Sequence, residues 1–164
     1  MDATVSAARE KLKNVTPLKK DCGRVCGARC CRPLEGEETG MLLFPGEEDA
    51  YAGLEGWTVR PAARGSLVVC PGTCDRDQRP LSCRLFPLLP LIGDDGNIRV
   101  VTDLRAKAVC PLARQGKSAL DPAFIDAVRE AGELLARDET QALFLDVLAE
   151  EQDGMRSLRA LFKL

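Results

Sequence analysis

The sequence predicts an α+β fold in which a loop-rich cysteine core with a small antiparallel sheet is followed by a C-terminal helical cap. Eight cysteines lie between positions 22 and 110 among glycines and prolines, and residues 88–102 show a hairpin pattern. After position 121, apolar side chains recur at helical spacing. The 164 residues are the length of one domain. We therefore expect a single domain, 1–164, with a metal-binding core at about 20–112 and a helical segment at about 121–163.

The N-terminal third is expected to contain one helix, one short strand and one helical turn. Thr4 is suited to cap the helix, whose apolar positions continue at helical spacing to Val15, and Pro17 marks its end. The apolar run 41–44 before Pro45 is a strand candidate, and 47–51 a helical turn. The acidic residues of this third lack calcium-loop spacing and are expected to form a solvated surface. They are Glu35, Glu37, Glu38, Glu47, Glu48 and Asp49.

The central region is expected to be mainly β structure with one short helix. Residues 93–97, Gly-Asp-Asp-Gly-Asn, tolerate positive φ and indicate a hairpin turn. Pro80 at the first helical position and Pro87 at the end predict a short helix within 79–86. The expected strands are 57–59, 66–70, 88–92 and 98–102.

The last third is predicted to form three helices that pack over the cysteine-bearing loops. Asp121 and Pro122 are typical of an N-cap and first helical residue, and Asp138 with Gln141 resembles a capping box. Gly154 is expected to separate the second helix from the third. The predicted inward residues are Phe124, Ile125, Val128, Leu134 and Leu135, then Leu143, Phe144, Val147 and Leu148, then Met155, Leu158, Leu161 and Phe162.

Charge and composition exclude several classes of function. The 23 basic and 25 acidic residues are mixed along the chain, which argues against nucleic-acid or anionic-membrane partners. The chain has no histidine, which excludes mixed cysteine and histidine zinc sites and a cysteine–histidine dyad. The longest apolar run, 85–92, is too short to span a membrane, and the charged N-terminus lacks the apolar region of a signal peptide. We expect a cytoplasmic protein.

The cysteines indicate a metal–thiolate site. Four of them fall within ten residues, a density typical of metal ligation rather than of a packed core. Cys30 and Cys31 are adjacent, and neighbouring side chains normally diverge. Either one of them is not a ligand, or the site is polynuclear or double. The competing interpretation is that the thiols are buried apolar residues or disulfides. The candidate metal ligands are Cys22, Cys26, Cys30, Cys31, Cys70, Cys74, Cys83 and Cys110.

A second motif follows the first cluster. Residues 74–87 contain the pairs Arg79-Pro80, Cys83-Arg84 and Phe86-Pro87. Together with the cluster that ends in Cys30-Cys31, this segment resembles the CxxCxxCC (YkgJ-like) family of proposed zinc- or iron-chelating proteins, over about 20–112. Three residues separate the first cysteines here, where the family has two. The resemblance implies zinc or iron chelation. One similar branch contains flagellin lysine methylases, which carry a cluster of this kind, and this implies a methylase-like activity.

The sequence thus predicts a cytoplasmic metal-binding protein whose thiolates hold an iron–sulfur cluster, [4Fe-4S], or Zn²⁺. An open cluster would support redox or radical chemistry, and an iron–sulfur-dependent oxidoreductase is one such enzyme. The alternative is a zinc-stabilised, non-catalytic protein-interaction module. Thiol–disulfide exchange is disfavoured because no Cys-x-x-Cys pair is present. Arg79 and Arg84 could bind an anionic substrate or the carboxylate of a nucleotide-linked methionine cofactor, or could brace a loop.

Overall fold

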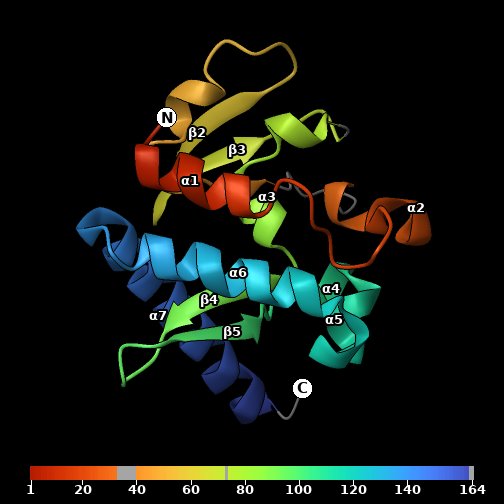
Figure 1. Ribbon diagram of the computed structural model, residues 1–164, viewed down its shortest axis with the longest axis vertical. Helices are drawn as coiled ribbons and strands as arrows, with labels where there is room; N and C mark the ends of the chain where they lie inside the picture. The colour runs from red at the N-terminus through yellow and green to blue at the C-terminus, as the bar shows by residue number, and fades with distance from the viewer. Residues whose placement is uncertain (33–39, 73, 163–164) are drawn as a thin grey trace.

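The computed structural model describes residues 1–32, 40–72 and 74–162, and shows the α+β fold that the sequence predicts (Figure 1). The strands are β1 (Met41–Leu42), β2 (Thr58–Ala62), β3 (Gly65–Val69), β4 (Leu88–Ile92) and β5 (Ile98–Thr102). The α-helices are α1 (Ala3–Lys11), α2 (Cys22–Cys26), α3 (Leu81–Leu85), α4 (Ala106–Val109), α5 (Pro111–Gln115), α6 (Pro122–Leu135) and α7 (Glu139–Phe162). The 3₁₀ helices are η1 (Arg29–Cys31), η2 (Glu48–Ala50), η3 (Arg76–Gln78) and η4 (Lys117–Ala119).

Two antiparallel sheets form the β structure. The first has the strand order β1-β3-β2, with Met41 opposite Val68. The second is the β4–β5 hairpin, which has the bounds predicted from the sequence. Its turn residues at 93–97 include Gly96, whose φ of 76° is in the left-handed region. In the described residues, no helix has both the length and the apolar character that a membrane crossing requires.

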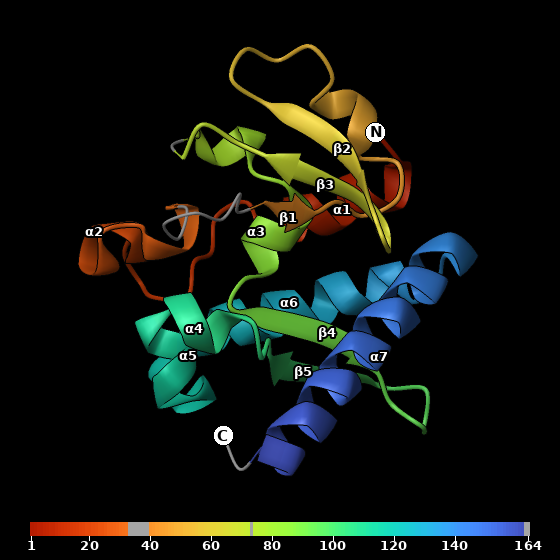
Figure 2. The ribbon, with the colours of Figure 1, turned by 180° about the vertical axis from the view of Figure 1, so that it is seen from behind.

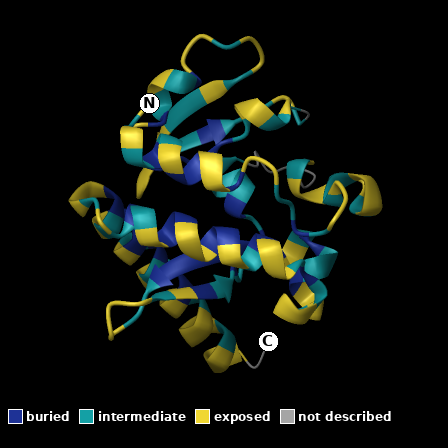
Figure 3. Cartoon of the chain, viewed as in Figure 1, coloured by how far each residue is buried: buried dark blue, intermediate teal, exposed yellow. Residues whose placement is uncertain are grey.

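The β4–β5 hairpin lies between α6 and α7, and this layer holds the main hydrophobic core. α6 is in front of the hairpin in Figure 1, and α7 is in front in the reverse view of Figure 2. The faces that meet are buried (Figure 3). A Cβ atom on Gly132 of α6 would lie 2.5 Å from Cβ of Pro90 in β4, so the close approach requires glycine. The core includes Val5, Leu12, Phe44, Leu81, Leu85, Leu88, Phe124, Val128, Leu135, Leu145 and Leu148.

α1 packs across α6 and connects the N-terminus to this core. Its N-cap is Asp2, whose carboxylate accepts a hydrogen bond from the backbone N–H of Val5 at 2.9 Å. The expected cap, Thr4, is instead inside the helix. Lys11 ends α1, so Val15 lies beyond it. The prediction of a helix was correct, but its first and last residues were not.

The C-terminal helices differ from the prediction in number and in what they cover. Residues 139–162 form one helix, and Gly154 does not end it. A glycine inside a helix costs only about 1 kcal/mol relative to alanine, which the rest of a long helix can offset. Gly154 is in an open position, with no atom within 4 Å of a Cβ placed there. Leu143, expected to point inward, is 61% exposed. α6 and α7 contact the hairpin, and the cavity that contains the cysteines is lined by segments up to Gln115. The expected packing over the cysteine-bearing loops is therefore wrong.

Candidate functional site

The first two cysteines lie on α2. Cys22 begins this helix and Cys26 ends it, so the two side chains are four residues apart and share a face. Asp21 is the N-cap, and its carboxylate accepts a hydrogen bond from the backbone N–H of Gly23 at 3.0 Å. This capping bond fixes the start of a helix that is too short to be stable alone.

Cys30 and Cys31 lie on the next turn, η1. The chain reaches it through Gly27 and Ala28, both in the left-handed conformation, with φ of 66° and 54°. The two sulfur atoms are 3.9 Å apart, so the expectation that these side chains diverge is wrong. Their hydrogen bond raises the pKa of Cys30 and lowers the pKa of Cys31 to about 6. The shared hydrogen bond therefore favours the thiolate form of one member of this pair.

Cys70 and Cys74 follow β3, and Gly72 between them lies against η1. Gly72 has a φ of 82°, and a Cβ atom there would be 3.3 Å from the carbonyl oxygen of Cys31. Cys83, on α3, lines the same cavity as Cys70 and Cys74. Burial raises the pKa of Cys83, and the charges of Cys31, Cys74 and Cys70 raise it further.

Cys110 joins α4 to α5 and is the one buried cysteine of the eight. It packs with Ala106 and Ala113 of these two helices. α4 contacts η1, and the charge of Cys110 raises the pKa of Cys22. Cys110 therefore lies close to the N-terminal cysteines, although it is far from them in the sequence.

All eight cysteines are free and line one cavity of about 640 Å³. Apolar side chains such as Leu12, Leu42, Phe86 and Leu112 supply much of the remaining wall. Within the described part of the chain, no three cysteine, aspartate or glutamate side chains are grouped closely enough to hold a metal ion. The structure thus brings every predicted ligand to one cavity, without the close grouping of a formed metal site.

Arg79 brings a positive charge close to these thiols. Its guanidinium donates a hydrogen bond to the sulfur of Cys74, and its charge acts to lower the pKa of Cys22, Cys31 and Cys74. Burial alone lowers the pKa of Arg79, but the hydrogen bond and the neighbouring acidic groups raise it overall. Arg79 is therefore placed to offset the negative charge of thiolates or of an anionic ligand.

Arg84 is engaged differently, although it also lines the cavity. Its guanidinium donates to the carbonyl oxygens of Arg79 at 3.0 Å, Arg76 at 2.9 Å and Asp77 at 3.0 Å. A longer bond of 3.4 Å reaches the carbonyl oxygen of Arg9 in α1. These contacts brace the 76–79 turn next to Cys74. Of the two arginines predicted to bind a cofactor, Arg79 is the one whose side chain is directed to the thiols.

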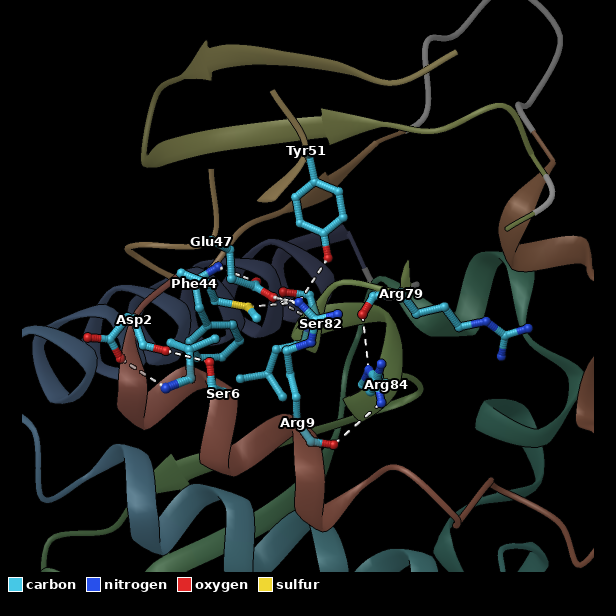
Figure 4. A network of polar contacts seen from close by, with 12 residues as sticks. Asp2, Ser6, Arg9, Phe44, Glu47, Tyr51, Arg79, Ser82 and Arg84 are labelled. Atoms are coloured by element: carbon cyan, nitrogen blue, oxygen red, sulfur yellow. Dashed lines mark hydrogen bonds and ion pairs between the residues drawn. The ribbon is translucent and has the colours of Figure 1, made fainter. Parts of the chain in front are cut away.

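A buried polar network beside the cavity holds α3 in place (Figure 4). Glu47 has no exposed surface, and burial raises the pKa of its carboxyl group. The carboxylate accepts bonds from the backbone N–H groups of Phe44 at 3.1 Å and Leu81 at 2.9 Å, and pairs with Arg9 at 3.5 Å. Arg9 also donates to the hydroxyl of Tyr51 at 3.3 Å. Figure 4 shows the side chain of Arg79 pointing away from this network.

Sequence reasoning missed the structural roles of Glu47, Arg9 and Asp21. Glu47 was expected on a solvated surface, and its complete burial corrects that expectation. Glu35, Glu37 and Glu38, from the same predicted surface, lie outside the described residues. The position of Asp21 directly before a short cysteine helix is a capping signal that could have identified it. For Glu47 and Arg9 the sequence holds no such local signal, because their partners are distant along the chain.

No family model matches the chain, and comparison with curated proteins and with solved structures found no match.

Proposed function

We propose that the protein binds metal through its cysteine thiolates, as an iron–sulfur cluster or as Zn²⁺. One observation carries the proposal: all eight cysteines are free and converge on one cavity, although they come from segments as far apart as α2 and the α4–α5 junction. A stabilising disulfide framework would pair these thiols, and a core packing role would bury them, whereas seven of the eight are partly or fully exposed.

The residues fit a soft metal. Thiolate sulfur is the ligand that zinc and iron–sulfur clusters prefer, and histidine is absent from the chain. Arg79 supplies a positive charge that offsets part of the thiolate charge. Burial and mutual repulsion raise the pKa of Cys22, Cys74 and Cys83 in the metal-free state, so metal binding would release protons from these groups.

We place the iron–sulfur cluster before zinc because the site is all-thiolate and includes an adjacent cysteine pair. A bound cluster of this kind supplies electron transfer or, with an open iron, cofactor-dependent radical chemistry. The protein's own contribution would be a cavity with many apolar side chains in its walls and the cation Arg79 near the thiols, which suits a small ligand with an anionic group. The methylase-like activity implied by the resemblance to CxxCxxCC proteins is one form that this cluster-dependent chemistry could take.

The second candidate is a zinc-stabilised interaction module without catalysis. Zinc closed by four thiolates has no open position for a substrate. We propose a cytoplasmic location for either form, since reducing compartments keep thiols free, and neither nucleic acid nor membrane as a partner, since the charges are mixed.

The experiment is anaerobic purification followed by metal and sulfide analysis and a visible absorption spectrum. Iron with matching sulfide and broad visible absorption supports the iron–sulfur form. Stoichiometric zinc in a colourless protein supports the interaction module. Protein that contains neither metal, and that takes up neither on reconstitution, contradicts the proposal.

A further inference from the structure

Two neighbouring thiols of the cavity lie close to one another. The sulfur atoms of Cys30 and Cys31 are 3.9 Å apart and share a hydrogen bond. In the described part of the chain, this is the one hydrogen bond between two cysteine side chains. The S–S bond of a disulfide is about 2.0 Å long. The two sulfur atoms therefore need to approach by only about 2 Å, through side-chain rotation, to form one.

The backbone around η1 holds the pair in this arrangement. The N–H of Cys31 donates to the carbonyl oxygen of Ala28 at 2.9 Å, and the N–H of Arg32 donates to that of Arg29 at 3.2 Å. Ala28 has a φ of 54°, a left-handed conformation that costs an alanine roughly 1 kcal/mol. Strained residues of this kind are concentrated at functional sites. Here the strained turn leads the chain from α2 into η1 and so determines where the two thiols lie.

Reagents in solution can reach the pair. Cys30 is exposed and Cys31 is partly exposed, whereas Cys110 is buried. Both members of the pair line the cavity of about 640 Å³, which is within the size range of small-molecule sites. A disulfide of the size of oxidised glutathione is therefore able to approach these two sulfur atoms.

We propose that Cys30 and Cys31 are a redox modification site, at which a small-molecule disulfide converts the metal-free pair into a reversible vicinal disulfide. One cysteine loses its proton and attacks the small disulfide, which forms a mixed disulfide and releases one small thiol. The second cysteine attacks the protein sulfur of the mixed disulfide and releases the other small thiol. The pair loses two electrons and two protons, and the small disulfide gains them as it is reduced to two thiols.

The adjacency of the two residues makes this disulfide easy to reduce. The peptide bond between them is trans, so their Cα atoms are about 3.8 Å apart, whereas an ordinary disulfide needs roughly 4.4–6.8 Å. Strained and exposed disulfides are the labile ones, typical of regulation rather than of stabilisation. The bond is therefore expected to form under oxidising conditions and to open again when thiols are in excess.

The disulfide and a metal would compete for the same sulfur atoms. This part of the inference rests on the proposed function, in which both members of the pair are candidate ligands. The thiolate form of cysteine is the one that binds metal, and a disulfide sulfur carries no such charge. Oxidation of Cys30 and Cys31 therefore hinders metal uptake, and bound metal protects the pair from oxidation.

The disulfide is tested on metal-free, full-length protein treated with excess oxidised glutathione. Remaining thiols are blocked with iodoacetamide before digestion with trypsin. The peptide that begins at Cys30, after Arg29, contains both thiols and no other cysteine. We expect this peptide to lack two hydrogen atoms and to carry neither label, and we expect excess reduced glutathione to restore both thiols. Two alkylated thiols, two glutathione adducts or a cross-link to another peptide overturns the inference.

Single variants identify the two partners. In Cys30→Ser and in Cys31→Ser, the remaining cysteine is expected to keep glutathione as a mixed disulfide, because no neighbour displaces it. Cys22→Ser is the matched control, since it removes a different cysteine of the same cluster, and it is expected to keep the vicinal disulfide. A control variant without that disulfide overturns the assignment of the pair. The wild-type peptide decides whether the bond forms even where a variant fails to fold.

The competition with metal is tested by Zn²⁺ uptake, measured by native mass spectrometry on the reduced, the oxidised and the re-reduced protein. We expect the oxidised protein to bind less Zn²⁺ and the re-reduced protein to recover. Equal uptake by the reduced and oxidised forms overturns the competition. Reduced protein that takes up neither Zn²⁺ nor iron with sulfide contradicts the proposed function, and the disulfide is still decided by its peptide.

Discussion

The carboxylate of Glu47 accepts a hydrogen bond at 2.9 Å from the backbone N–H of Leu81, 34 positions later in the chain. Its second oxygen accepts from the N–H of Phe44 at 3.1 Å. Leu81 is the first residue of α3, the helix that carries Cys83, and Phe44 follows strand β1. One buried side chain therefore fixes a cysteine-bearing helix to the segment that follows strand β1.

Glu47→Gln is expected to lower the free energy of unfolding by about 1–3 kcal/mol, because the amide NH₂ would face one of the two backbone N–H donors and leave it unsatisfied. Urea denaturation of the metal-free protein measures the change. Glu133→Gln, at an exposed position of α6, is the control and is expected to change stability by less than about 0.5 kcal/mol. Equal stability of the two variants would contradict the structural role of Glu47.

Arg84→Ala is expected to destabilise the metal-free protein by about 1–3 kcal/mol, because the carbonyl oxygens of Arg76, Arg79 and Asp77 lose their donor. Arg84→Lys should recover only part of this, since an ammonium group does not reproduce the planar fork of guanidinium. Thermal or urea denaturation measures both variants. Arg129→Ala removes an arginine of an exposed ion pair and should change little. Full recovery by lysine would show that charge alone matters at position 84.

Arg79→Gln is expected to shift Zn²⁺ binding to higher pH. The Arg79 charge favours the thiolate forms of Cys31 and Cys74, so its removal raises their pKa values, and zinc must displace protons that are held more tightly. At a fixed pH below those pKa values, the apparent affinity therefore falls several-fold. Competition with a chromophoric chelator at a series of pH values measures the shift. Arg79→Lys keeps the charge and should shift less; an equal shift in both variants would point to a geometric role instead.

Gly132→Ala and Gly154→Ala are expected to have opposite effects. A methyl group at Gly132 would meet Cβ of Pro90 at 2.5 Å and Cγ2 of Ile98 at 2.8 Å, which separates α6 from the hairpin and costs about 1–3 kcal/mol. At Gly154 the methyl group meets no atom within 4 Å, and alanine should stabilise α7 by about 0.5–1 kcal/mol. Thermal denaturation compares the two. A destabilised Gly154→Ala would contradict the continuous α7.

Local signals predicted the elements that depend on local chemistry. The turn at 93–97 gave the hairpin its correct bounds, and Asp121 with Pro122 gave the start of α6. Asp2 and Thr4 are both good caps, and the choice between them is made by tertiary contacts: Asp2 donates its backbone N–H to the carbonyl oxygen of Gly46. Glu47 resembles its acidic neighbours Glu48 and Asp49 in sequence, and its burial depends on partners distant along the chain, Leu81 and Arg9.

The identity of the candidate ligands was also available from the sequence, since thiol density needs no knowledge of the fold. Their arrangement was not. The approach of Gly72 to Cys31 and the contact between α4 and η1 join segments that are far apart in the chain. The 3.9 Å separation of Cys30 and Cys31 depends on the turn at Ala28, which adopts a positive φ that alanine rarely takes.

The main hydrophobic core has no cysteine among its described residues; Phe44, Phe124 and Leu145 pack there without one, and only Cys110 belongs to a smaller cluster. Small zinc domains fold around their metal, because they have little else to bury. Here the main core is complete without the cysteines, so folding of this chain is expected not to depend on metal. If the chain binds metal as we propose, the metal would then enter a polypeptide that has already folded.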